Sequence, residues 1–278
     1  MNAPYSVVSA RNLSLTFETN DGPVHALSNV DLEVKKGDFV SFIGPSGCGK
    51  TTFLRVIADL EKHTAGEITV NDMTPENARK ARSYGYVFQA AALYPWRTIE
   101  NNIALPLEIM GYGAAEKKKR IEQTLELVNL SGFAKKYPWQ LSGGMQQRAS
   151  IARALAFDAD LLLMDEPFGP LDAQTRQIMG NLLLDLWSRD RKALIFVTHD
   201  LEEAIALSDR VVVMSAGPAA GIVADYRVPL PRPRDIAEIR LEKAFHEIHR
   251  DIWASLRVEV QKAYAMGEGK ELVGGAGA

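Results

Sequence analysis

The chain has 278 residues and a mass of 30.6 kDa, enough for one large domain or two modest ones of about 100–200 residues each. Hydrophobic residues make up 46% and charged residues 24%, which excludes wholesale disorder. The net charge of −3 and the pI near 6.0 argue against a free-standing nucleic-acid binder, because such proteins normally carry a basic excess. The single cysteine, Cys48, cannot form an internal disulfide and fits a reducing compartment.

The apolar runs of the chain are short, and none approaches the ~18 residues that a membrane-spanning helix needs. Residues 1–10 have neither the basic start nor the apolar core of a secretory signal. We therefore expect a soluble, intracellular protein. This expectation leaves open whether its partners lie in a membrane.

The first third of the chain alternates short β-branched runs with turn signals. Residues 32–34 and 39–43 are predicted strands, joined by a tight turn at 35–38. Residues 51–60 repeat apolar side chains at helical spacing, which predicts a helix packed on a sheet.

Between about residues 90 and 158 the pattern becomes helical. Residues 115–130 form a predicted amphipathic helix, and the basic run 117–120 is interpreted as its solvated face. The Ala- and Gln-rich stretch 143–157 also predicts a helix. We interpret this block as a helical insertion within an α/β domain.

Strands and helices alternate again after this block. The uniformly apolar runs 161–164 and 193–198, separated by a helical stripe over 179–187, are typical of a parallel sheet and predict an α/β fold. The proline-rich linker 228–235 leads to a predicted C-terminal helix over about 235–264. The final residues, 266–278, are predicted to be a disordered tail.

The segment Gly44–Thr51 matches the phosphate-binding P-loop pattern G-x-x-x-x-G-K-[ST], and it follows a predicted strand and opens a predicted helix. Its glycines let backbone N–H groups converge on phosphate oxygens, and the helix N-terminus adds positive potential. Lys50 would place its ammonium on the β- and γ-phosphates, and the Thr51 hydroxyl would bind Mg²⁺.

Cys48 lies inside this loop. Its simplest role is that of a small filler. A helix N-terminus lowers the pKa of a thiol, however, so we expect Cys48 to react faster than an average cysteine. Alkylation is then expected to inhibit the protein, and bound nucleotide to protect it.

Two acidic residues and a histidine follow predicted buried strands. Asp165 would bring a carboxylate to the Mg²⁺ ion, and Glu166 would act as general base toward the attacking water. His199 follows the strand predicted at 193–198. Because the carboxyl ends of parallel strands meet at one edge, we interpret His199 as a γ-phosphate contact.

The segment Leu141–Arg148, LSGGMQQR, is more specific than the P-loop. Six features follow one another along the chain and together resemble the ATP-binding cassette (ABC) ATPases: the P-loop, Gln89, Leu141–Arg148, Asp165–Pro167, Asp172 and His199. The resemblance implies an α/β P-loop NTPase core with an N-terminal antiparallel β region and an α-helical subdomain inserted at about 90–158. It implies a single domain over residues 1–265.

The family pattern implies a role for each matching residue. Ser142, Gly143 and Gly144 resemble the signature loop, which binds the γ-phosphate of ATP held by the opposite protomer. The implied catalytic residues are Glu166, His199, Lys50 and Gln89. The implied Mg²⁺ ligands are Thr51, Gln89 and Asp165. The implied ATP-binding residues are Phe17, Gly44, Pro45, Ser46, Gly47, Cys48, Gly49, Lys50, Thr51, Thr52, Ser142, Gly143, Gly144 and Asp172.

Phe17 stands at the place of the aromatic residue that stacks on adenine in this family, where Tyr is usual. A Phe that faces the core is the alternative interpretation. Two departures, Met145 in the signature loop and Pro170 before Leu171, touch no charged catalytic group.

Four features of the sequence resemble the ATPase subunits of the importers of nitrate, sulfonates and taurine: Met145 and the segments 93–99, 101–103 and 229–235. This resemblance implies ATP and Mg²⁺ as cofactors. The implied partners are a second copy of the chain, membrane permease subunits and, indirectly, a solute-binding protein, with no nucleic acid. The implied location is peripheral, on the cytoplasmic face of the inner membrane.

Two other functions stay open. The chain could serve the import of another small solute, or it could be a non-transport ABC ATPase acting on nucleic acid or ribosomes. The second class brings long coiled-coil insertions or two cassettes in one chain, whereas this sequence has one cassette. A GTPase or kinase of the P-loop class is disfavoured by the signature loop.

Overall fold

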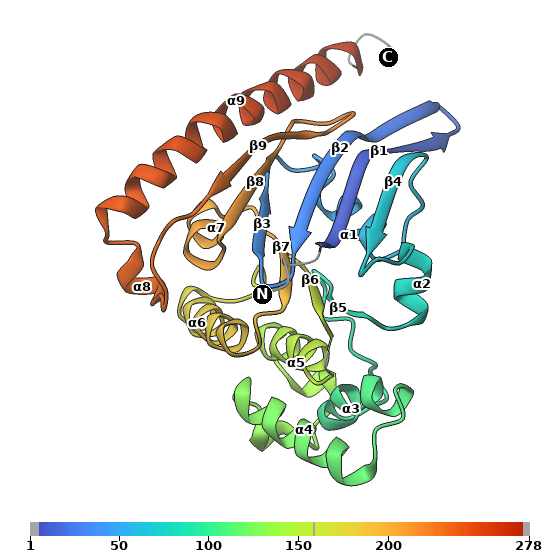
Figure 1. Ribbon diagram of the computed structural model, residues 1–278, viewed down its shortest axis with the longest axis vertical. Helices are drawn as coiled ribbons and strands as arrows, with labels where there is room; N and C mark the ends of the chain where they lie inside the picture. The colour runs from blue at the N-terminus through green and yellow to red at the C-terminus, as the bar shows by residue number, and fades with distance from the viewer. Residues whose placement is uncertain (1–5, 158, 275–278) are drawn as a thin grey trace.

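A computed structural model describes residues 6–157 and 159–274. Two sheets form the centre of the molecule (Figure 1). The smaller is antiparallel, in the order β2 (Gly22–Lys35), β1 (Ser6–Thr19) and β4 (Ala65–Val70). In the described ranges, no helix is long and apolar enough to cross a membrane.

The larger sheet has six strands in the order β5-β6-β7-β3-β8-β9. The first five are parallel and the last is antiparallel to its neighbour. Their bounds are Phe39–Ile43 for β3, Tyr84–Val87 for β5, Leu161–Asp165 for β6, Ala193–Val197 for β7, Arg210–Met214 for β8 and Ile222–Arg227 for β9. The predicted parallel α/β sheet is therefore confirmed.

Every residue of β3, β6 and β7 is buried, because both faces of the larger sheet are covered. Alternate side chains belong to two separate cores. Phe42 packs with the antiparallel sheet and with α1 (Lys50–Ile57), whereas Phe39 packs with helices on the other face. This two-sided burial explains why these strands are mostly apolar in sequence, with the buried Ser41 in β3 and Asp165 at the end of β6 as their polar residues.

The helices α3 (Ile99–Ile109), α4 (Ala114–Leu127) and α5 (Gly143–Leu155) form a block below the sheet in Figure 1. Two short 3₁₀ turns, Ser131–Phe133 and Pro138–Gln140, connect α4 to α5. Helix α3 lies within the segment predicted as a helical insertion, although its own bounds were not predicted, and its interior holds Pro106.

The remaining helices are α2 (Pro75–Lys80), α6 (Ala173–Asp190), α7 (Leu201–Leu207), α8 (Ile236–Ile239) and α9 (Lys243–Gly274). Of these, α2 packs against β4 of the smaller sheet, whereas α7 and α9 pack against strands of the larger sheet and α6 contacts α8. Residues 235–264, predicted as one helix, contain the short α8 and most of α9, and α9 continues to Gly274. The last part of the predicted tail, residues 275–278, lies outside the described residues.

Asn102 of α3 organises the loop that leads into the helical block. Its side chain is fully buried, and its Nδ2 donates to the carbonyl oxygens of Tyr94, Arg97 and Thr98 at 3.0–3.1 Å. Its Oδ1 accepts from the Tyr94 N–H at 2.7 Å. The loop is thereby held in one conformation, with the Trp96 side chain 70% exposed.

We predict that Asn102→Ala lowers the free energy of unfolding by about 1–3 kcal/mol, because it leaves a buried N–H and several carbonyls without a partner. Denaturant unfolding measures this loss, and limited proteolysis at residues 94–98 reports on the loop. Asn101→Ala, at the exposed neighbouring position, is the matched control. Equal stability of the two variants would contradict the assignment.

Candidate nucleotide-binding site

The P-loop connects β3 to the N-terminus of α1. The first backbone N–H groups of a helix have no partner inside the helix, so they are free to bind an anion. Gly49 is the N-cap residue and has a left-handed conformation, with φ of 90°. A Cβ at this position would lie 3.0 Å from Leu27 Cδ2 and 3.2 Å from the Ala26 carbonyl oxygen. Both the backbone conformation and the close approach of β2 therefore require glycine here.

The Lys50 ammonium lies over this loop. Its Nζ donates to the carbonyl oxygens of Gly44 at 2.8 Å and Pro45 at 3.0 Å, and the residue is only 7% exposed. These contacts hold the positive charge at the place where the loop would receive phosphate oxygens. The structure thus places the Lys50 ammonium beside the loop backbone, and its contact with the β- and γ-phosphates stays a prediction.

Thr51 and Asp165, two of the predicted Mg²⁺ ligands, meet directly. Thr51 Oγ1 donates to Asp165 Oδ1 at 2.8 Å, although the residues are 114 positions apart. Burial raises the pKa of the Asp165 carboxyl, and the neighbouring Glu166 adds to this effect. A buried carboxylate beside a hydroxyl is a hard oxygen donor pair of the kind that Mg²⁺ prefers.

The Thr51 hydroxyl and the Asp165 carboxylate are two oxygen ligands, too few to hold a metal ion by protein groups alone but suitable for Mg²⁺. Among the described residues, no group of three or more His, Cys, Asp or Glu side chains could hold a metal ion. Mg²⁺ commonly takes one or two protein ligands and completes its shell with water and substrate phosphates. The residues present therefore fit a Mg²⁺ ion that arrives with a nucleotide.

Glu166 follows Asp165 at the carboxyl end of β6, and its side chain contacts two other residues that the family pattern implies to be catalytic, Gln89 and His199. Its Oε2 accepts from Gln89 Nε2 at 3.1 Å and lies 3.4 Å from His199 Nδ1. Its backbone has φ of 44°, a left-handed value that costs about 1–3 kcal/mol for a non-glycine residue. The Glu166 N–H donates to the Val197 carbonyl oxygen at 2.9 Å, which ties this conformation to β7.

Behind His199, a polar network holds the turn into α7. Thr198 Oγ1 donates to Glu203 Oε2 at 2.5 Å and accepts from the Asp200 N–H at 3.0 Å. Asp200 is the N-cap residue of α7, and its Oδ1 accepts from the Glu203 N–H. Burial raises the pKa of the Glu203 carboxyl to about 7.

Sequence reasoning missed Glu203. The signal that could have found it is the pair Asp200 and Glu203, spaced as in a capping box at the start of a helix. That pattern usually leaves the glutamate exposed, whereas Glu203 is 7% exposed here.

The signature loop lies at the start of α5. Ser142 is the N-cap residue, and its Oγ accepts from the Met145 N–H at 3.3 Å. Ser142 and Gly143 are exposed, and a Cβ at Gly143 would meet nothing within 4 Å. Helix α5 packs against α3, α4 and β5, whereas α1 packs against β2, β4 and β6. The P-loop and the signature loop are therefore built on different parts of one chain.

Asp172 and Phe17 also lie near the surface. Asp172 is the N-cap residue of α6, and the N–H and hydroxyl of Thr175 donate to its carboxylate, which lowers the pKa of Asp172.

Phe17 lies in the β1–β2 hairpin opposite Val24 and is 36% exposed. A core-facing Phe17 is therefore wrong, and the adenine contact stays a prediction.

Comparison with known proteins agrees with this arrangement. The family model for the ABC transporter matches residues 27–169. An uncharacterized ABC transporter ATP-binding protein of Methanocaldococcus jannaschii is 44% identical over 256 residues, covering 92% of this chain and 93% of its own length. The chain belongs to the ABC transporter ATP-binding family.

Two further relatives have names that state an imported solute. The aliphatic sulfonates import ATP-binding protein SsuB of Bacillus cereus is 41% identical, covering 88% of this chain and 94% of its own length. The taurine import ATP-binding protein TauB of Roseobacter denitrificans is 40% identical, with the same coverage of 88% and 94%.

A solved ABC cassette has the same fold. The dimeric, post-hydrolysis structure of the ATP-binding cassette MJ0796 bound to ADP and Pi superposes with a TM-score of 0.74 at 34% identity. It covers 81% of this chain and 100% of that cassette.

Within this ABC ATPase, Cys48 differs from expectation. The residue is 1% exposed and packs in the core between the larger sheet and the antiparallel sheet. Burial raises the pKa of the Cys48 thiol, and this effect exceeds the opposing influence of the nearby Lys50 ammonium. The expectation of a reactive thiol is therefore wrong, because the side chain points beneath the loop.

We predict that Cys48 in the native protein reacts with a disulfide reagent such as DTNB at pH 8 about 10-fold or more slowly than in the urea-unfolded chain, because both access and thiolate fraction are reduced. Absorbance of the released thiolate gives both rates. Cys48→Ser supplies the background, since the chain has one cysteine. Equal rates for native and unfolded chain would contradict the buried position.

We predict that Glu203 makes the folded state less stable as the pH rises from about 4.5 to 7. Its folded pKa, about 7, is raised above its usual value, so its contribution is full at low pH and is lost through this range. Glu203→Gln should remove this loss, which amounts to roughly 1–3 kcal/mol between pH 5 and pH 8.

Thermal unfolding at the two pH values measures this difference. Glu242→Gln, at an exposed position, is the matched control. If Glu203→Gln and Glu242→Gln showed the same pH dependence of Tm, the raised pKa of Glu203 would be disproved.

Proposed function

We propose that this chain is the ATP-binding and ATP-hydrolysing subunit of an ABC importer for a sulfonate-type solute, of the nitrate, sulfonate and taurine group. The observation that supports this most is the contact of Thr51 with Asp165, together with the contacts that Glu166 makes with Gln89 and with His199. Nucleotide, metal and water chemistry need these groups at one edge of the sheet.

ATP binding would use the P-loop N–H groups and the Lys50 ammonium for the phosphates, with Phe17 stacking on adenine. Thr51, Asp165 and Gln89 would hold Mg²⁺, which would offset the negative charge of the phosphates. Burial disfavours the ionised form of Asp165 and so raises its pKa. A divalent cation nearby would favour the ionised carboxylate and offset this effect, which fits the role of a Mg²⁺ ligand.

In hydrolysis, Glu166 would act as general base. Its carboxylate accepts a proton as the oxygen of a water molecule forms a bond to the γ-phosphorus and the bond to the β-phosphate oxygen breaks. Gln89 and His199 both contact Glu166 Oε2, so they orient this carboxylate. When ATP is bound, His199 would contact the oxygens of its γ-phosphate.

A complete site would need a second copy of the chain. Ser142, Gly143 and Gly144 are exposed or half-buried at a helix N-terminus, the kind of element that binds an anion. Since the P-loop lies on a different part of the chain, the signature loop and Asp172 would serve the ATP held by the partner. The dimeric state of the cassette MJ0796 supports this arrangement.

Permease subunits would bind at the loop that follows Gln89. Tyr94 and Trp96 of this loop are 41% and 70% exposed, their rings lie 5.3 Å apart, and Asn102 fixes the backbone. A solute-binding protein would act on the permease from the opposite side. In this proposal the chain would act peripherally, on the cytoplasmic face of the membrane.

Transport of a different small solute is the second candidate, because the solute contacts belong to other chains. The names of SsuB and TauB favour sulfonates and taurine. An action on nucleic acid is disfavoured by the acidic balance of −3.

We predict that Glu166→Gln binds ATP but lowers the hydrolysis rate by about 10²–10⁴-fold, the usual contribution of a positioned general base. The variant should also form a stable dimer when ATP is present, because the nucleotide persists between the two copies. Phosphate release, nucleotide titration and gel filtration with and without ATP measure these effects.

Glu67→Gln, at an exposed position of β4, is the matched control. A near wild-type rate in Glu166→Gln would overturn its role as base. A variant that binds ATP and stays monomeric at saturating ATP would overturn the two-copy site.

A further inference from the structure

Helix α7 connects the site to a polar network that the proposed chemistry does not use. The helix has seven residues and begins directly after Asp200, so its carbonyl end lies about 10 Å from the loop that holds His199. A helix this short has little stability of its own, so its position depends on its packing against β3, β8, α8 and α9 and on the contacts at its ends.

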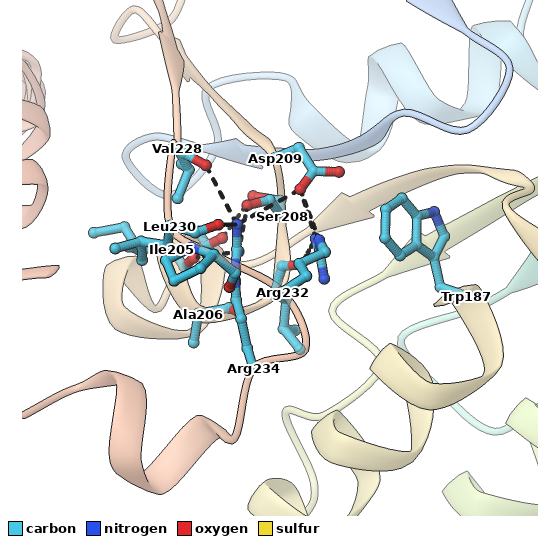
Figure 2. A network of polar contacts seen from close by, with 12 residues as sticks. Trp187, Ile205, Ala206, Ser208, Asp209, Val228, Leu230, Arg232 and Arg234 are labelled. Atoms are coloured by element: carbon cyan, nitrogen blue, oxygen red, sulfur yellow. Dashed lines mark hydrogen bonds and ion pairs between the residues drawn. The ribbon is translucent and has the colours of Figure 1, made fainter. Parts of the chain in front are cut away.

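The carbonyl end of α7 is bound by a buried arginine, Arg234, which follows β9 in the proline-rich linker (Figure 2). Its side chain is fully buried. Its guanidinium donates to six carbonyl oxygens at 2.8–3.4 Å, those of Ile205, Ala206, Ser208, Val228, Leu230 and Pro231.

Arg232 completes the set. Its Nη2 donates to the Leu207 carbonyl oxygen at 2.8 Å, and its Nε donates to Asp209 Oδ1 at 2.9 Å. Because α7 ends at residue 207, the carbonyl oxygens of its last turn have no N–H partner within the helix. Arg232 and Arg234 together donate hydrogen bonds to the carbonyl oxygens of residues 205–208.

The charges in this network are balanced locally. Asp209 Oδ1 lies 2.8 Å from Arg232 Nη2 and 3.5 Å from Arg234 Nη2, and the negative end of the α7 dipole faces the same two guanidinium groups. Burial, with the charge of Arg232, lowers the pKa of Arg234 to about 10, which keeps it protonated at neutral pH.

The same segment also binds α6, the helix that begins after Asp172. The Arg232 guanidinium lies 4.2 Å from the centre of the Trp187 ring, and Figure 2 shows the two side chains facing each other. Asn181 accepts from the Ile236 N–H at 3.0 Å and donates to Asp235 at 3.2 Å. One segment therefore contacts both helices that begin at the site.

We propose that Arg232 and Arg234 are positioning residues for His199. By binding the carbonyl end of α7, they fix the helix whose other end adjoins the loop that carries His199. The contact of Arg232 with Trp187 also fixes α7 relative to α6. The proposal rests on the function proposed above for His199. A displacement of α7 would move His199 away from Glu166 Oε2, which now lies 3.4 Å from its Nδ1.

The main test compares Arg234→Lys with the wild-type chain, as purified full-length protein. Lysine keeps the charge but has three donors, too few for the six carbonyls. Nucleotide binding belongs to the P-loop, so ATP affinity should stay within about twofold while kcat falls about 10-fold, in line with the cost of misplacing a reacting group. The NMR signals of the His199 ring, assigned with His199→Ala, should shift.

Arg232→Lys is the milder second variant and decides the matter if Arg234→Lys does not fold. Arg191→Lys is the matched control, because Arg191 also lies against the Trp187 ring, at 4.4 Å, but belongs to the end of α6. This control should leave kcat and the His199 signals unchanged.

The outcomes separate the two proposals. A folded Arg234→Lys or Arg232→Lys with wild-type kcat, or with unshifted His199 signals, overturns the positioning role. An equal loss in Arg191→Lys also overturns it, because the effect then belongs to Trp187 packing alone. If His199→Ala hydrolyses ATP at the wild-type rate, the catalytic role of His199 fails, while the shifts still test how the two arginines position it.

Discussion

The parallel pairing of β6, β7 and β3 is the constraint on which the site depends. Asp165 lies opposite Val197, so the residues that follow these strands reach the same edge of the sheet. β3 lies beside β7 and delivers the P-loop there as well. The hydrogen bond between Thr51 and Asp165 is possible only because this pairing brings two segments far apart in sequence into contact.

Most of this arrangement could be predicted from the sequence, because its physical causes are local patterns. Strands buried on both faces are apolar in sequence, which predicts β6 and β7, whereas the β-branched run beside a turn predicts β3. The P-loop combines glycines with a strand and a helix, a pattern with few other uses. Parallel strands then require one common edge, which predicts that Asp165, Glu166 and His199 converge.

What the sequence did not provide is the direction of individual side chains. Cys48 lies at a helix N-terminus, which predicts a low thiol pKa, but its Sγ points into the core, where desolvation has the larger effect. Glu203 fits a capping pattern that is normally exposed, yet tertiary packing buries it. In α3, Pro106 lies inside a helix that its neighbours stabilise, including Asn102 with its buried hydrogen bonds.

The proline-rich linker shows how a segment distant from ATP can affect the site. Helices α6 and α7 each begin with an aspartate cap, Asp172 and Asp200. Arg234 binds the other end of α7, and Arg232 contacts Trp187 near the other end of α6. A short helix transmits a displacement of one end to the other, since its hydrogen-bonded turns move together. The buried Arg234 therefore links the path of the chain after β9 to the position of His199, although it lies in neither the P-loop nor the loop that carries His199.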